Sequence, residues 1–235
     1  MLTTIGFDAD DTLWHNEVFF RLTQNRFADL LSDYVPPDIL HDQLLAVERR
    51  NLGIYGYGVK GFTLSMIETA LDITKGAVPG RVIAELMAAG REMLAQPIDL
   101  LPHAYDAVTK LAQTHRILLI TKGDLLDQER KLAQSGLGDF FHGVEIVSDK
   151  TAPVYDSIFT RHGAKIDQSM MVGNSLKSDV LPVLAAGGFG VHVPHDMTWA
   201  VEHAAEPTEN PRYHRLTNLA GLSDLVGKLS TTHHI

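Results

Sequence analysis

The sequence of 235 residues contains no cysteine. Disulfide bonds, thiolate catalysis and zinc sites built on cysteine are therefore excluded. The sequence also lacks any stretch that approaches the ~20 consecutive apolar residues of a membrane-spanning helix. An apolar run that opens close to Met1 leaves no room for a secretion signal. We therefore expect a cytoplasmic location and no membrane partner.

Basic residues are scarce as well. The chain has 20 Lys and Arg against 29 Asp and Glu, which gives a formal net charge of −9. Binding to nucleic acid needs a basic face, so the composition disfavours nucleic acid as a partner. A small anionic substrate remains compatible with this charge, because the local field of a site can differ from the net charge.

The second half of the chain alternates between short apolar runs and helix-like segments. Strands are expected at 117–120, 144–147, 170–172 and 189–193, and helices at 103–113, 125–134, 153–162 and 176–186. This alternation is typical of an α/β fold, in which a parallel sheet carries helices on both faces. The run Ile5–Phe7 is expected to be the first strand of that sheet.

Between the first strand and the alternating region the pattern is helical throughout. Helices are expected at 17–32, 38–50, 62–73 and 79–95, and residues 51–61 are expected to form a loop rich in glycine and tyrosine. Four successive helices with no strand between them do not belong to a layer of strand–helix–strand units. The sequence thus predicts a core of residues 1–16 and 98–235, into which an all-helical cap of residues 17–97 is inserted.

Two acidic residues follow the first apolar run directly. Asp8 ends the run and Asp10 lies two positions later, so a buried parallel strand would deliver both to the carboxyl edge of the sheet, where ligands bind in such folds. Paired carboxylates raise each other's pKa unless a cation offsets them, and Mg²⁺ prefers oxygen ligands of this kind. A turn with a helix N-cap explains Asp11 and Thr12 equally well, but it explains Asp8 poorly.

The segment Phe7–Leu13, with the sequence FDADDTL, resembles the first motif of the haloacid dehalogenase superfamily, DxDx(T/V). Two later strand ends fit, in order, the second motif, which is an apolar strand that ends in Ser or Thr, and the third motif, which is a lysine after a later strand. Thr121 ends the run 117–120 and Lys150 follows the run 144–147, whereas Arg161 fits the third motif less well. A strand-end threonine or a loop lysine alone is a weak signal, and the order and spacing of the motifs carry the resemblance.

The fourth motif departs from the superfamily in one residue. The segment 171–180 resembles the acidic motif in which Gly and Asp are followed, three or four residues later, by a second Asp. Asp179 matches that second acid, but Asn174 stands where the first acid usually stands. Asparagine keeps an oxygen ligand and loses a charge, so it can bind a metal directly or through water, with weaker affinity.

The resemblance implies a Rossmann-like core with a helical cap and a Mg²⁺-dependent phosphatase. Asp8 would attack phosphorus and form an aspartyl-phosphate, and Asp10 would act as general acid and then base. The metal ligands would be Asp8, Asp10 through its carbonyl, Asp179 and Asn174. The phosphoryl group would be held by Thr121, Lys122 and Lys150.

An acid at position 10 separates this chain from the 2-haloacid dehalogenases, which resemble it elsewhere but lack that acid. Halide leaves without a proton, whereas an alkoxide needs one, so phosphatase is favoured over dehalogenase. A phosphomutase or other phosphotransferase would use the same residues. A receiver-like phospho-binding module would need its acceptor Asp at the end of a third strand, which this sequence does not offer.

The substrate is expected to be a small phosphorylated metabolite, such as a sugar phosphate, a phosphoglycolate-like acid or a nucleotide. In capped members of the superfamily, the insert supplies contacts to the leaving group. The candidate residues for those contacts are His15, Tyr55, Tyr57 and Lys60. The sequence carries no indication of the oligomeric state.

Overall fold

The computed structural model describes residues 1–231 and divides into two compact units. Among the described residues, the sheet unit comprises 1–15, 98–122 and 128–231, and the helical unit comprises 16–97 and 123–127. The inclusion of 123–127 in the helical unit was not foreseen from the sequence. That the helical unit acts as a cap stays a prediction.

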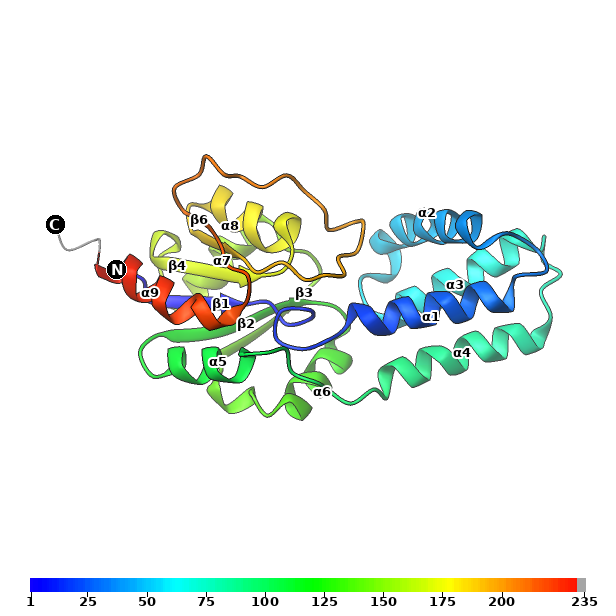
Figure 1. The fold of residues 1–235 in the computed structure, drawn as a ribbon, viewed down its shortest axis with the longest axis horizontal. Coiled ribbons are helices and arrows are strands. Elements are labelled where there is room, and N and C mark those ends of the chain that lie inside the picture. The colour runs from blue at the N-terminus through cyan, green and yellow to red at the C-terminus, as the bar shows by residue number, and fades with distance from the viewer. Residues whose placement is uncertain (232–235) are drawn as a thin grey trace. The chain divides into compact units, whose positions relative to one another are not determined.

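The sheet unit is built on six parallel strands in the order β3-β2-β1-β4-β5-β6 (Figure 1). Their bounds are Thr4–Phe7 (β1), Arg116–Lys122 (β2), Gly143–Val147 (β3), Ser169–Gly173 (β4), Phe189–His192 (β5) and Tyr213–Arg215 (β6). The predicted parallel α/β sheet is confirmed. Strand β6 was not predicted, because three residues are too few to show a pattern.

Helices cover both faces of this sheet, because successive strand residues point to opposite faces. The sheet helices are α5 (Ala104–Ala112), α6 (Leu125–Ser135), α7 (Ala152–Arg161), α8 (Leu181–Ala186) and α9 (Leu222–Thr231). One core joins Ile117 and Leu119 of β2 to α5 and α9, and the other joins Leu118 and Ile120 to α7 and α8. Helices on both faces are the expected arrangement.

The helical unit consists mainly of four helices that pack on one another around their own apolar core. They are α1 (Glu17–Leu30), α2 (Pro37–Tyr55), α3 (Val59–Ile73) and α4 (Gly80–Leu94). The loop expected at 51–61 was wrong for most of its length, since α2 continues to Tyr55 and α3 starts at Val59. The apolar and polar side chains of this segment fit a helix as well as a loop, so the composition did not distinguish between the two.

The order of the strands decides where a site can form. Strand β1 lies between β2 and β4, with Phe7 opposite both Leu119 and Val172. The strand order reverses at β1 and β4, and ligands of open α/β sheets bind outside the carboxyl ends at such a point. The residues that follow β1, β2 and β4 therefore meet at one edge. No helix among residues 1–231 is both long and apolar enough to cross a membrane.

Candidate active site

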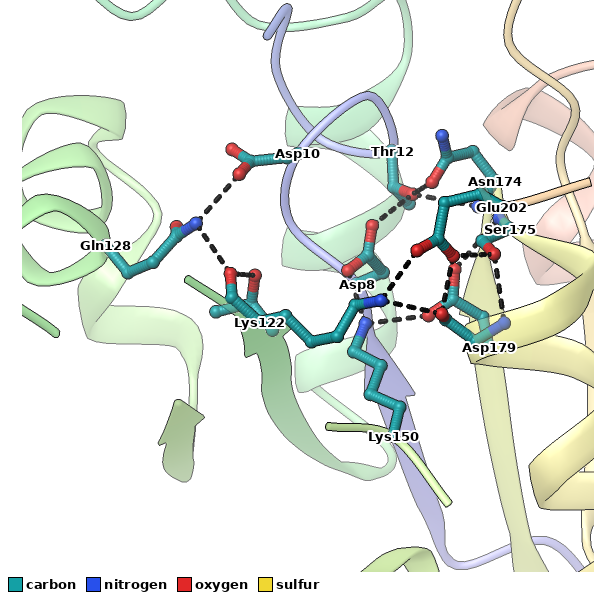
Figure 2. A network of polar contacts seen from close by, with 12 residues as sticks. Asp8, Asp10, Thr12, Lys122, Gln128, Lys150, Asn174, Ser175, Asp179 and Glu202 are labelled. Carbon is teal, nitrogen blue, oxygen red and sulfur yellow. Dashed lines mark hydrogen bonds and ion pairs between the residues drawn. The ribbon is translucent and has the colours of Figure 1, made fainter. Parts of the chain in front are cut away.

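Asp8 lies at the centre of this edge. Its backbone N–H donates to the Val172 carbonyl at 2.9 Å, which continues the pairing of β1 with β4 by one residue. Its carboxylate accepts hydrogen bonds from Lys150 Nζ on one oxygen and from Thr12 Oγ1, at 3.0 Å, on the other (Figure 2). Burial and the neighbouring Asp179 raise the pKa of Asp8 to about 7, and Lys150 acts in the opposite direction.

Lys150 joins the first and fourth motifs. Its ammonium donates to Asp8 and, at 2.7 Å, to Oδ1 of Asp179, and its side chain is 1% exposed. Burial lowers the pKa of Lys150, but the charges of Asp179 and Asp8 outweigh that effect and hold it above its ordinary value. A buried charge is tolerated when it is paired, so this lysine remains an ammonium that bridges two carboxylates.

Asp179 is held by the turn that precedes it. Its Oδ2 accepts a hydrogen bond from the Ser175 backbone N–H at 2.9 Å. A Cβ at position 173 would lie 2.2 Å from that oxygen, so only glycine leaves room for it. The single helix expected at 176–186 was wrong in one detail, because Leu176–Val180 forms a wider π-helical turn before α8. Such turns are frequent at functional sites.

Thr12 and Asn174 connect the loops after β1 and β4. Thr12 Oγ1 donates to Asp8 and contacts Asn174 Oδ1 at 3.3 Å, and it accepts a hydrogen bond from the Asn174 backbone N–H at 3.1 Å. The intervening Asp11 has φ of +57°, a left-handed conformation that Asp tolerates better than most residues do. The turn after Asp10 can therefore form at this position without a glycine.

The carboxylate of Asp10 turns away from Asp8 and toward Gln128 (Figure 2). It accepts hydrogen bonds from Trp14 Nε1 at 2.7 Å, from Gln128 Nε2 at 2.7 Å and from Lys131 Nζ at 2.9 Å. The side chains of the two acids thus have separate sets of partners, although the sequence led us to expect them at one point. No motif in the sequence indicated Gln128 or Lys131.

The two residues at the end of β2 lie inside the strand rather than after it. Thr121 is buried, and its hydroxyl donates to the Lys122 carbonyl at 3.2 Å. The Lys122 ammonium donates to Ser178 Oγ at 2.8 Å and to Glu202 Oε1 at 2.7 Å. Lys122, which we expected to bind phosphate, therefore also has a structural role, because its ammonium connects Ser178 with Glu202.

Glu202 is a site residue that the sequence analysis missed. It lies in the irregular segment between β5 and β6, and its Oε2 accepts hydrogen bonds from the hydroxyls of Ser175 and Ser178 (Figure 2). Burial raises its pKa, but Lys122 and the two hydroxyls outweigh this and lower it below the ordinary value. No strand, helix or motif marks this position, so only the folded chain reveals it.

The candidate substrate residues occur in both units. In the sheet unit, the rings of His15 and His195 pack edge to face, with 6.1 Å between their centroids. The His195 Nε2 atom lies 3.8 Å from the Asp11 carboxylate. In the helical unit, the Lys60 ammonium pairs with Asp124 at 2.9 Å. Tyr55 ends α2 and is 49% exposed, and Tyr57 lies in the following turn. Their contacts to a substrate stay predictions.

Hard oxygen atoms dominate the donor set at the sheet edge. Asp8 and Asp179 are two buried carboxylates that share one buried ammonium, so the pair retains a negative charge that suits a divalent cation. The Asn174 amide oxygen contacts the same Thr12 hydroxyl that binds Asp8. Among residues 1–231, no three side chains of His, Cys, Asp or Glu form a metal-binding group. Amide and carbonyl oxygens would therefore have to complete a Mg²⁺ site.

Comparisons with known proteins agree on the family. A haloacid dehalogenase-like family hydrolase from Xanthomonas campestris has a sequence 39% identical to this one. Its crystal structure matches with a TM-score of 0.88 over 98% of this chain and 93% of that one. The protein YfnB of Bacillus subtilis, solved with bound magnesium, shares the fold at 17% identity, with a TM-score of 0.67 over 96% of this chain and 98% of that one.

A glyceraldehyde 3-phosphate phosphatase from Methanothermobacter thermautotrophicus is 24% identical in an alignment 214 positions long, which covers 85% of this chain and 89% of that protein. The family model of the haloacid dehalogenase-like hydrolases matches residues 2–187. That match spans the first to the fourth motif, and of the residues described at the sheet edge it leaves out Glu202 and His195. The chain is therefore an enzyme of the haloacid dehalogenase-like hydrolase family.

Proposed function

We propose that this hydrolase is a Mg²⁺-dependent phosphatase that cleaves a small phosphomonoester through an aspartyl-phosphate on Asp8. The observation that carries the proposal is the arrangement around Asp8. One of its oxygens is bound by the Lys150 ammonium and the other by the Thr12 hydroxyl, at the point where the strand order reverses. Both contacts fix the direction in which the carboxylate can attack.

The proposed reaction has two steps. Asp8 attacks phosphorus, the bond from phosphorus to the leaving oxygen breaks, and Asp10 gives a proton to that oxygen. Asp10 then takes a proton from the water that attacks phosphorus, which releases phosphate and restores Asp8. The Lys150 ammonium and the Thr121 hydroxyl would stabilise charge on the phosphoryl oxygens.

Mg²⁺ would be held by Asp8, Asp179, Asn174 and the Asp10 carbonyl, and it would supply neutralisation of the phosphoryl charge. The charge balance of the buried site supports this cofactor. The magnesium bound to the YfnB structure, which shares the fold, is compatible with it.

Phosphate esters suit the site better than haloacids do. An alkoxide leaving group needs a proton, and Asp10 is the acid that a dehalogenase of this family would lack. The relative from Methanothermobacter thermautotrophicus is named for a three-carbon sugar phosphate, which supports a small phosphorylated metabolite as the substrate class.

The experiment is to measure phosphate release from a panel of phosphomonoesters that starts with triose phosphates, with and without Mg²⁺, together with chloride release from 2-chloropropionate. The matched variant is Asp8→Asn. Phosphate release that requires both Mg²⁺ and Asp8 is the expected result. Chloride release without phosphate release would establish the dehalogenase alternative, and transfer of phosphate to an added sugar would establish a phosphotransferase.

A further inference from the structure

The carboxylate of Asp10 is enclosed by donors from two parts of the sheet unit. Trp14 lies in the same loop, four residues later, and donates to Oδ1. Gln128 and Lys131 come from α6, where Gln128 donates to Oδ2 and Lys131 lies 2.9 and 3.2 Å from the two oxygens. Residues three apart share one face of a helix, so α6 presents both donors together.

These donors are buried, which makes their arrangement informative. Gln128 is 2% exposed and Lys131 is 8% exposed. A buried N–H donor is unfavourable unless it is paired, and Asp10 supplies an acceptor to Lys131 Nζ and to Gln128 Nε2. The Gln128 Oε1 atom is buried without a hydrogen-bond partner among residues 1–231. Gln128 Nε2 also donates to the Lys122 carbonyl at 3.0 Å, so the same amide joins Asp10 to the end of β2.

We propose that Lys131 and Gln128 are positioning residues for Asp10, an inference that rests on the proposed phosphatase function. They hold the carboxylate of the general acid–base between α6 and β2, turned away from Asp8, so that its position in the substrate-free enzyme is set by buried side chains of α6. Trp14 alone would leave the carboxylate with one side-chain donor and freedom to rotate.

Positioning of an acid has a chemical signature that a purely structural role lacks. Loss of the acid slows the departure of an alkoxide but hardly affects p-nitrophenolate, which leaves without a proton. Since kcat/KM reports the steps up to phosphoryl transfer to Asp8, the ratio of kcat/KM for an alkyl phosphate to that for p-nitrophenyl phosphate isolates the acid step.

The test compares Lys131→Met and Gln128→Glu with matched substitutions of exposed residues, Lys110→Met and Gln113→Glu. General acid–base catalysis contributes about 10²–10⁴-fold, so we expect the alkyl-to-aryl ratio to fall by roughly tenfold or more in both α6 variants. The two controls are expected to leave the ratio unchanged.

A double-mutant cycle with Asp10→Asn separates positioning from general damage. If Lys131 acts through Asp10, Lys131→Met lowers the alkyl-phosphate rate no further in the Asp10→Asn background. An equal loss on both substrates, an unchanged ratio, or full additivity with Asp10→Asn would overturn the inference while leaving the phosphatase function intact. If the unaltered enzyme releases phosphate from neither ester, the proposed function itself fails and this inference fails with it.

Discussion

The side-chain ammonium of Lys122 lies 2.7 Å from a carboxylate oxygen of Glu202, which is 80 positions later in the chain. The two side chains are 11% and 13% exposed, so this ion pair is largely removed from water. Ser178 contacts both partners, which connects the end of β2 to the turn that carries Asp179. The segment between β5 and β6 is thereby anchored at the edge of the sheet where Asp8 lies.

Glu202→Gln is expected to destabilise the fold, because it leaves the buried Lys122 ammonium without its opposite charge. Loss of one partner of a buried charged hydrogen bond costs about 1–3 kcal/mol. The measurement is urea unfolding at neutral pH. The control is Glu85→Gln, which breaks an exposed pair with Arg26, and an exposed pair contributes at most about 1 kcal/mol. Equal effects of the two substitutions would contradict the importance of the buried pair.

Lys150→Met is expected to be more severe, because it leaves Asp8 and Asp179 as two buried carboxylates without an ammonium between them. Breaking such a buried pair costs about 3–5 kcal/mol. Adding Asp8→Asn removes one of the two charges, so the double variant is expected to unfold at a higher urea concentration than Lys150→Met does. The exposed Lys165→Met serves as the control. Simple additivity of the two substitutions would show that Lys150 does not act by bridging the acids.

The motifs and the sheet could be predicted because each has a local signal. Asp8, Thr121 and Asp179 lie at or near strand ends, where an apolar run stops, and parallel strands bring such ends to one edge. The partners of these residues have no such signal. Gln128 and Lys131 look like ordinary polar residues of a helix, and their burial against Asp10 depends on where α6 packs. Glu202 lies in a segment without periodicity, and only tertiary contacts bring it to Lys122.

Asn174→Asp is expected to tighten Mg²⁺ binding, because it restores the second acid of the motif and adds a charge to the ligand set. The gain should be on the order of tenfold in the dissociation constant, measured by calorimetric titration of the substrate-free enzyme. Asn25→Asp, on an exposed part of α1, is the control for the added charge. Unchanged affinity would show that residue 174 contacts neither the metal nor its bound water.

Glu48 gives the helical unit a stability that depends on pH. Burial raises its pKa from 4.5 to about 7, so the folded state keeps the proton that the unfolded state loses. The contribution of Glu48 to the free energy of unfolding is therefore greatest below pH 4.5 and decreases as the pH rises toward 7. Glu48→Gln is expected to stabilise the protein by up to about 3 kcal/mol at pH 8 and by little at pH 4.5. Thermal unfolding at both values, with the exposed Glu129→Gln as control, tests this; an equal gain at both would contradict it.

The central claim is that Asp8 becomes phosphorylated during turnover. Borohydride reduces an acyl phosphate, so an enzyme quenched during turnover and treated with borohydride would carry homoserine at the modified position. With p-nitrophenyl phosphate, whose leaving group needs no proton, the Asp10→Asn variant still forms this species but lacks the base for the second step, so it should accumulate it. We predict homoserine at position 8, seen by mass spectrometry only when substrate is present. Phosphate release with no modification at position 8, or with modification of another acid, would contradict the account.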